Sequence, residues 1–336
     1  MPERVGFMLE VPADLVTAYG PVRLAAEKLL AGLPGVRKAQ VVLTAELASA
    51  PAKPSSAKLS PQAVDQTRPK APVASARPDH VKAVIAVGSG KGGVGKSTVA
   101  LGLALGLKAL GLRAGFLDAD IYGPSAPVML GLRQPPEFGL DKLMVPLEAF
   151  GIRVNSVGFL VEPDQAMIWR GPMASQALTQ LLTQTRWGTD AEPLDVLVVD
   201  LPPGTGDVQL TLTQKTLIDG AVVVSTPQDM ALADARRAVT LFAKTGIAVL
   251  GVVENMAWLE LPGGGRMDVF GSGGARRLAD TMQVAFLGEV PLDPTLRASM
   301  DAGKPLTVTD PDGDMAARFR DMAQAVMDQL GRLAAD

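Results

Sequence analysis

Cysteine is absent from the 336 residues of the chain, and histidine occurs once, at His80. Without thiols the chain forms no disulfide, has no cysteine nucleophile and offers no thiolate ligand to zinc or to an iron-sulfur cluster. A single histidine also argues against a histidine-based metal site and against a Ser-His-Asp triad. The metal chemistry that remains is that of Mg²⁺, which prefers oxygen ligands.

The sequence also lacks a strong excess of charge of either sign and long apolar runs. The formal net charge is only −3, so no basic field indicates nucleic acid or anionic lipid as a partner. Residues 1–4 lack the layout of a signal peptide, and no uncharged apolar stretch is long enough to span a bilayer. We therefore expect a cytoplasmic protein that engages neither nucleic acid nor a membrane.

Residues 1–47 have the pattern of a small unit of their own. Residues 5–11 and 36–44 read as strands, and residues 21–30 read as an amphipathic helix between them. A β-α-β unit of this length builds little core by itself, so we expect it to dimerise or to dock.

Residues 48–80 differ in composition from the rest of the chain. They are rich in Pro, Ala, Ser and Lys and contain few large apolar residues. Such a segment buries too little surface to order itself, so we interpret it as a linker, with His80 as a solvated residue at its end. Residues 81–336 then form the main domain.

The main domain opens with a glycine-rich segment. Residues 90–97, Gly-Lys-Gly-Gly-Val-Gly-Lys-Ser, fit the pattern G-x-x-x-x-G-K-[ST], in which backbone N–H groups surround a polyphosphate. A strand is expected at 82–87 and a helix at 97–110, so helix N-terminal amides also face this loop. The alternative is an ordinary glycine-rich turn with a surface lysine. The predicted nucleotide-binding residues of the loop are Gly90, Lys91, Gly92, Gly93, Val94, Gly95, Lys96, Ser97 and Thr98.

Apolar strands alternate with helical stretches throughout the main domain. This alternation predicts an α/β fold with a mostly parallel sheet covered by helices on both faces. Functional side chains are then expected at the carboxyl ends of the strands. The further candidate strands are 113–117, 152–157, 195–199, 221–225, 248–253 and 284–290.

One strand end carries a candidate magnesium site. Residues 194–200 form an apolar strand that ends in Asp200, which suits the carboxylate that holds Mg²⁺ beside the Ser97 hydroxyl. The Gly- and Pro-rich segment that follows includes Gly204, whose amide is a candidate sensor of a γ-phosphate. The alternative is that Asp200 merely begins a tight turn.

A second strand end carries the pair Asp118 and Asp120. Phosphoryl transfer to water requires an attacking water held in line, and a carboxylate near the γ-phosphate orients it. We assign this role to Asp120 and place Asp118 nearer the metal. A helix-capping or turn role for one of the two is the alternative.

These motifs together resemble a known family. The two lysines Lys91 and Lys96 in one loop are similar to the deviant Walker A loop of the ATPases that include MinD, ParA and the nitrogenase iron protein. Residues 117–125, 169–173 and 200–207 resemble the Mrp/ApbC group of iron-sulfur cluster carrier ATPases. Further matching segments, at 255–256, 270–275 and 290–293, extend the resemblance over nearly all of 81–300.

The resemblance implies a homodimer that sandwiches ATP, with Lys91 of one subunit reaching the phosphates bound by the other. Lys91, Lys96 and Asp120 are then the catalytic residues, and Asn255 matches a family asparagine that contacts adenine. A loop asparagine without such a role is the alternative. Residues 1–47 are similar to the latter part of a MIP18-like domain, here truncated.

The chain departs from the family at one place. A pair of cysteines that ligates a bridging cluster across the family dimer belongs near Leu261 and Gly264, and neither residue supplies a soft ligand. Residues 262–265 favour a hairpin turn between 258–261 and 267–270, so the scaffold is expected to persist without its ligands. We therefore hypothesise an ATP-switched dimer that holds no cluster by its own side chains and works with a cysteine-bearing partner or keeps only the switch.

Two other classes of function fit parts of the sequence. A positioning or partitioning ATPase of the MinD/ParA kind acts on membrane or nucleoid, and the C-terminal helix bears on this alternative. Its apolar face is flanked by charges of both signs rather than a basic face, which favours packing on the sheet over lipid binding. The other class is a module that binds nucleotide without turnover; the lysines Lys91 and Lys96 with Asp120 and Asp200 argue for slow hydrolysis instead.

Overall fold

The computed structural model describes most of the main domain and three segments before it. The described ranges are 4–12, 19–32, 38–46, 77–160, 171–206, 209, 212–213 and 216–335. Most of the predicted linker and residues 169–170 and 207 of the family motifs lie outside these ranges. The chain divides into two compact units, Met1–Arg68 and Pro69–Asp336. Within the described residues, no helix is long and apolar enough to cross a membrane.

The first unit is a parallel strand pair with one helix. Its elements are β1 (Arg4–Pro12), α1 (Gly20–Ala31) and β2 (Lys38–Glu46). Strands β1 and β2 pair in parallel from Arg4 opposite Lys38 to Pro12 opposite Glu46. Pro21 lies in the first turn of α1, where a missing N–H costs no hydrogen bond. The strand-helix-strand prediction is confirmed, while the likeness to a MIP18-like domain stays a prediction.

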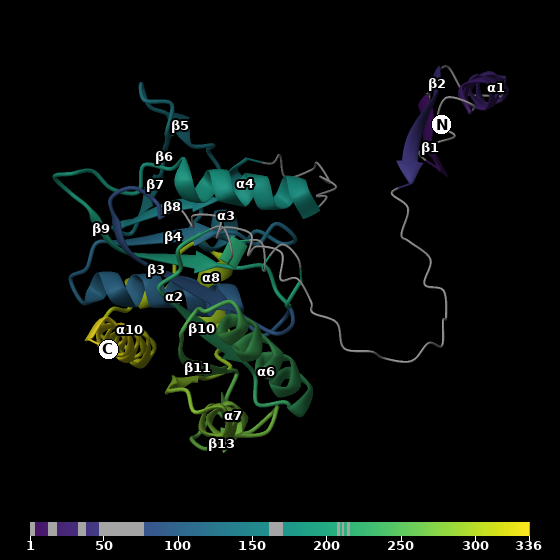
Figure 1. Ribbon diagram of the computed structural model, residues 1–336. Helices are drawn as coiled ribbons and strands as arrows, with labels where there is room; N and C mark the ends of the chain where they lie inside the picture. The colour runs from purple at the N-terminus through teal and green to yellow at the C-terminus, as the bar shows by residue number, and fades with distance from the viewer. Residues whose placement is uncertain are drawn as a thin grey trace, which may run out of the picture. The chain divides into compact units, whose positions relative to one another are not determined.

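The second unit is built on an eight-stranded sheet (Figure 1). All neighbouring strands pair in parallel except β7, which runs antiparallel to β8 at one edge. Each predicted strand is present, with ends that differ by at most two residues. In spatial order the strands are β14 (Phe286–Val290), β11 (Val249–Asn255), β10 (Gly220–Ser225), β3 (Val81–Gly88), β9 (Leu194–Asp200), β4 (Ala114–Asp118), β8 (Ile152–Ser156) and β7 (Leu147–Ala149).

Helices cover both faces of this sheet, as the sequence predicts. Within β3, Ile85 and Val87 join one buried cluster while Val84 and Ala86 join the other, because successive side chains of a strand point to opposite faces. Figure 1 shows α10 and α6 on opposite sides of β10 and β11. One face carries α2 (Lys96–Ala109), α3 (Ala126–Met129), α8 (Pro294–Asp301), α9 (Leu306–Thr309) and α10 (Asp314–Ala335); the other carries α4 (Gly171–Thr183), α6 (Asp229–Lys244) and α7 (Gly274–Met282).

The C-terminal helix α10 contacts β14 and β11, so its predicted packing on the sheet is confirmed, and it also packs on α2. Phe319 is fully buried, and a Cβ on Gly102 would lie 2.3 Å from its ring. A Cβ on Gly106 would lie 2.4 Å from the Phe319 carbonyl oxygen. The two glycines of α2 therefore allow the backbones of the two helices to approach closely.

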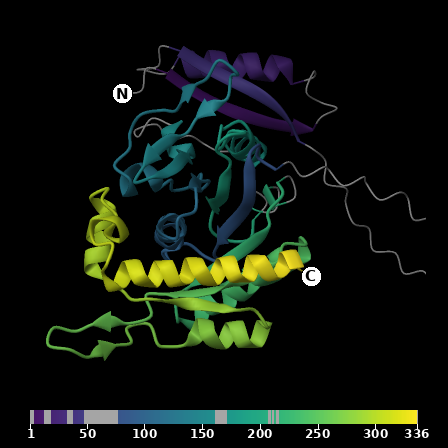
Figure 2. The ribbon, with the colours of Figure 1, turned by 90° about the vertical axis from the view of Figure 1, so that its left-hand side faces the viewer.

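The described residues of the second unit also include two short hairpins and a 3-10 turn, η2 (Val157–Phe159). One hairpin pairs β5 (Glu137–Phe138) with β6 (Met144–Val145), and the other pairs β12 (Leu259–Glu260) with β13 (Arg266–Met267). The hairpin of β12 and β13 projects from the body of the unit (Figure 2). It confirms the predicted hairpin, although its second strand begins one residue earlier and is shorter than expected.

Candidate functional site

The loop between β3 and α2 depends on glycine at three positions. Gly93 and Gly95 have φ of +81° and +76°, a left-handed conformation that side chains disfavour. Gly90 has an ordinary φ but no room, since a Cβ would lie 2.0 Å from the backbone carbon of Asp234 in α6. Gly95 also caps α2, so the free amides of the first turn of α2 open beside this loop. Such a helix N-terminus favours a phosphate.

Lys96 joins the loop to two of the predicted carboxylates. Its side chain is almost fully buried, and its Nζ lies 2.6 Å from Asp200 Oδ1 and 3.4 Å from Asp120 Oδ2. The Ser97 hydroxyl oxygen lies 3.4 Å from the same nitrogen. The structure therefore brings together four residues that the sequence predicts as a site, from α2, β9 and the segment after β4.

Burial and charge compete in this cluster. Burial alone would lower the pKa of Lys96, but the charges of Asp200 and Asp120 outweigh that effect and raise it. Burial raises the pKa of Asp200, and the Lys96 ammonium opposes this rise. Burial and the charge of Asp200 raise the pKa of Asp118 to about 6. At neutral pH we take the Lys96–Asp200 pair as ionised because of its short contact.

Asp118 holds the loop that follows β4. Its Oδ2 accepts hydrogen bonds from the amides of Ser125 and Ala126, at 2.8 and 2.9 Å, and from the Ser156 hydroxyl, at 2.9 Å. Its Oδ1 accepts from the Asp120 amide at 3.2 Å. Four donors of the chain thus occupy this carboxylate. A direct contact with Mg²⁺ stays a prediction, and it requires at least one of these bonds to be given up.

Asp200 and Ser97 offer oxygens suited to Mg²⁺. Asp200 Oδ2 is buried and has no hydrogen bond of normal geometry among the described residues. The Ser97 hydroxyl is close enough to lower the pKa of the same carboxylate. Hard oxygen donors of this kind match the ligand preference of Mg²⁺. The residues present therefore fit the ion.

The predicted phosphate sensor Gly204 is engaged elsewhere in this structure. Its amide donates to the Ser89 carbonyl at 3.0 Å, and the Ser89 hydroxyl donates to the Lys91 carbonyl at 2.9 Å. Among the described residues, the Lys91 ammonium has no hydrogen-bond or ion-pair partner. A sensing role for Gly204 stays a prediction, and it requires the bond to Ser89 to open.

Asn255 holds the other end of the phosphate-binding loop. It is the last residue of β11, and its Nδ2 donates to the Val94 carbonyl at 2.8 Å. A Cβ on Gly95 would lie 2.1 Å from the same nitrogen, so this glycine also leaves room for the amide. The structure thus shows Asn255 as a clamp on the loop, and the predicted contact with adenine stays a prediction.

Glu254, the residue before Asn255, is a positioning residue that the sequence did not reveal. It is 1% exposed, and its two carboxylate oxygens accept from the amides of Gly273 and Ala275 at 3.0 and 2.6 Å. Those amides open helix α7, where a negative charge stabilises the helix. An acid at the end of an otherwise apolar strand was the available signal. Glu254 thereby fixes β11, and with it Asn255, against α7.

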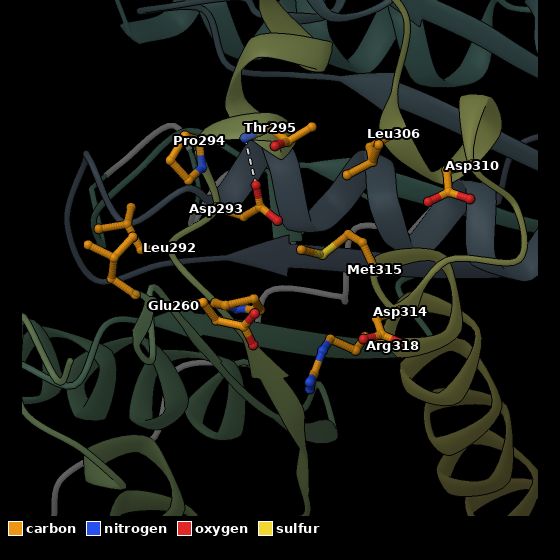
Figure 3. Close-up of a pocket in the computed structure, with 12 residues that line it drawn as sticks. Glu260, Leu292, Asp293, Pro294, Thr295, Leu306, Asp310, Asp314, Met315 and Arg318 are labelled. Atoms are coloured by element: carbon orange, nitrogen blue, oxygen red, sulfur yellow. Dashed lines mark hydrogen bonds between the residues drawn. The ribbon is translucent and has the colours of Figure 1, made fainter. Parts of the chain in front are cut away.

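A separate cavity of about 360 Å³ lies between β12, the segment after β14, and helices α9 and α10 (Figure 3). Four carboxylates and one guanidinium line it, and none of its lining residues belongs to the loop before α2. The Asp293 carboxylate is already engaged, because its Oδ1 accepts a hydrogen bond from the Thr295 amide at 2.6 Å and caps α8. The acidic lining makes this cavity unsuited to a triphosphate.

The hairpin of β12 and β13 marks where the resemblance placed a cysteine pair. Leu261 is 36% exposed, and a Cβ on Gly264 would have no atom within 4 Å. At the base of the hairpin, the guanidinium groups of Arg266 and Arg318 lie 4.1 and 5.1 Å from the ring centre of Trp258. Cation-π contacts therefore fix the base of the hairpin to α10, while its tip is open to solvent.

The tip also lacks a substitute for thiolates. The chain contains no cysteine. Among the described residues, no group of three or more His, Asp or Glu side chains is arranged to hold a metal ion. The side chains present therefore do not suit the binding of an iron-sulfur cluster by this chain alone.

Known proteins resemble about three quarters of the chain. An iron-sulfur cluster carrier protein of Salmonella typhimurium is 49% identical over 252 residues, which cover 74% of this chain and 67% of the relative. The iron-sulfur cluster transfer protein NUBPL of Dictyostelium discoideum is 47% identical over 255 residues, 75% of this chain and 78% of the relative.

Solved structures agree with this likeness. A nucleotide-binding protein of Archaeoglobus fulgidus, in complex with ADP, superimposes with a TM-score of 0.61 at 38% identity, over 71% of this chain and 92% of that one. The cell division ATPase MinD of Pyrococcus furiosus, at 21% identity and a TM-score of 0.56, covers 73% of this chain and 98% of its own, and shows the fold alone. The fold is that of an α/β P-loop NTPase.

A family description covers the same part of the chain. It is that of the NUBPL iron-transfer P-loop NTPases, within the ParA group, and it matches residues 80–327. The glycine loop, the buried lysine and the two carboxylates described above all lie within this range. The chain therefore belongs to the NUBPL iron-transfer P-loop NTPase family.

Proposed function

We propose that this protein binds ATP with Mg²⁺ at the loop before α2 and hydrolyses it as a homodimeric switch. The observation that carries the proposal is the buried Lys96 ammonium, 2.6 Å from Asp200 and 3.4 Å from Asp120, directly after a glycine loop that ends at a helix N-terminus. A buried cation between two acids is poised to exchange them for phosphate oxygens. The relatives' names and the bound ADP of the Archaeoglobus protein support the same proposal.

Each residue of the cluster has a part in this reaction. The amides of residues 90–98 surround the β- and γ-phosphates, and Lys96 neutralises the charge that builds on the transferred group. Ser97 and Asp200 hold Mg²⁺, which supplies further neutralisation of the phosphates when bound. Asp120 accepts a hydrogen bond from the attacking water and orients it in line. Asp118 positions Asp120 through the bond to its amide.

Lys91 acts from the second subunit in this proposal. Its ammonium has no partner within the described residues, which leaves it available to the phosphates bound by a twin chain. Charge supplied across a dimer makes hydrolysis depend on assembly. Turnover is therefore expected to be slow in the isolated subunit.

For the iron-sulfur cargo we propose a role without direct ligation. The absence of thiols and of a grouped metal-ligand set argues that a cysteine-bearing partner protein holds the cluster during transfer. The alternative within the same proposal is that the chain keeps only the nucleotide switch. The two alternatives share the same ATPase site, and they differ in whether a cysteine-bearing partner protein works with this chain.

ATP hydrolysis by the purified protein tests the first part of the proposal. We expect Lys96→Ala to lose turnover, and we expect Asp120→Ala to bind ATP but not to hydrolyse it. Lys91→Ala is expected to lose turnover as well, because Lys91 acts across the dimer, but to leave the melting temperature unchanged, because its ammonium has no partner among the described residues. Unchanged turnover in the Lys96 or Asp120 variant would show that the chemistry lies elsewhere.

Anaerobic reconstitution with iron and sulfide tests the second part. The purified protein is expected to stay free of cluster absorbance, with or without ATP. A stable cluster on this chain alone would refute the argument from its missing ligands.

A further inference from the structure

Gln209 is a buried polar residue that the mechanism above does not use. It is 1% exposed, and neither its Nε2 nor its Oε1 has a hydrogen-bond partner among the residues that the structure describes. A buried carboxamide without partners destabilises the state that contains it. The conformation seen here is therefore not the one in which this side chain is satisfied.

The position of Gln209 places it beside the phosphate-binding loop. A Cβ on Gly88, the last residue of β3, would lie 3.2 Å from Gln209 Nε2 and 2.9 Å from the ring of Phe242. The carboxamide thus lies against the backbone one residue before Ser89. Ser89 is the residue whose carbonyl accepts the Gly204 amide.

These two observations concern neighbouring residues of one segment, Gly88 and Ser89. If Gly204 turns its amide toward a γ-phosphate, the Ser89 carbonyl loses its donor. Gln209 Nε2 is an unpaired donor against the backbone at Gly88, one residue before that carbonyl, so a local shift of its side chain brings it within reach. The bond from the Gly204 amide to Ser89 opens, and a bond from Gln209 to Ser89 forms. When the phosphate accepts from the Gly204 amide, Gly204, Ser89 and Gln209 Nε2 all have hydrogen-bond partners.

We propose that Gln209 is a positioning residue that replaces Gly204 as the hydrogen-bond donor to the Ser89 carbonyl when a γ-phosphate is bound. The proposal rests on the proposed function, since it requires ATP at this loop. The exchange couples the presence of the third phosphate to the segment that follows Asp200. ADP has no γ-phosphate to attract the Gly204 amide, so the exchange distinguishes ATP from ADP.

Gln209→Met tests the exchange because it keeps the length of the side chain and removes its polar atoms. The free protein is expected to melt about 3–6 °C higher, since the unpaired carboxamide is gone. The dissociation constant for a non-hydrolysable ATP analogue with Mg²⁺ is expected to rise about tenfold, equivalent to about 1.4 kcal/mol. The dissociation constant for ADP is expected to stay within twofold of the wild-type value.

Thr307→Val provides the matched control. The Thr307 hydroxyl is also buried and unpaired among the described residues, but it lies in α9 and not beside Ser89. This variant is expected to raise the melting temperature of the free protein without changing either nucleotide constant. It separates the general gain from removing an unpaired polar group from the effect specific to the γ-phosphate.

Three outcomes overturn the proposal. Equal weakening of ATP-analogue and ADP binding in Gln209→Met would show a structural role that ignores the γ-phosphate. Unchanged binding of both would show that the carboxamide keeps the same surroundings in both states. A lower melting temperature of the free variant would show that Gln209 is already satisfied. Absence of nucleotide binding by the wild-type protein would instead refute the proposed function, and this inference with it.

Discussion

Truncation of Asn255 to alanine separates two roles that one side chain has been given. The structure shows its Nδ2 donating to the Val94 carbonyl at 2.8 Å, at a residue that is 5% exposed. The alanine variant loses this bond and leaves a carbonyl of the phosphate-binding loop unpaired, at a cost of about 1–3 kcal/mol. A change of 1 kcal/mol shifts the melting temperature of a domain of this size by about 2–4 °C. We therefore expect the free variant to melt about 2–12 °C lower.

The assay is thermal unfolding of the nucleotide-free protein, monitored by far-UV circular dichroism. Asn255→Asp is the companion variant, because it keeps the size of the side chain but presents an oxygen to the Val94 carbonyl in place of a donor. We expect it to be at least as unstable as the alanine variant. Binding of ATP and GTP to both variants then reports any contact with the base.

The result that refutes a clamping role is specific. If the free Asn255→Ala protein unfolds at the wild-type temperature while its preference for ATP over GTP is lost, Asn255 serves the base alone. If stability falls and base preference persists, the bond to Val94 is its main contribution. A loss of both assigns both roles to it.

Three further outcomes follow from other contacts. Phe319→Ala should lower the free energy of unfolding in urea by about 3–5 kcal/mol, because it leaves a cavity between α10 and α2. Leu333 is 44% exposed, so Leu333→Ala should change the same free energy by less than about 0.5 kcal/mol. Glu254→Gln should weaken the cap of α7 by about 1.5–3 kcal/mol and speed amide hydrogen exchange there; unchanged exchange would contradict the capping role. The double variant Leu261→Cys with Gly264→Cys should gain cluster absorbance on reconstitution, and the matching double serine variant should not.

The local parts of the site were predictable because their signals lie close together in the sequence. The spacing of Gly90, Gly95 and Lys96 identifies the loop, and the apolar runs on each side fix β3 and α2 to within one residue. The acid at the end of β9 follows from the same rule, since functional residues gather at the carboxyl ends of parallel strands.

The long-range contacts were not predictable from these patterns. The bond between Asn255 and Val94 joins residues 161 positions apart, and the one between Ser156 and Asp118 joins residues 38 apart. Periodicity and spacing describe neighbours along the chain and carry no information on which strand ends meet. The same limit hid the role of Glu254, whose partners lie 19 and 21 residues further on.

The tip of the β12–β13 hairpin has a consequence for substitutions made there. Gly263, Gly264 and Gly265 all have positive φ, and a Cβ on any of them would meet no atom within 4 Å. A side chain at any of these positions meets no neighbour, but the left-handed backbone strains every residue other than glycine. The tip therefore tolerates added bulk without contact to the rest of the unit, and the only penalty for a side chain there is local backbone strain.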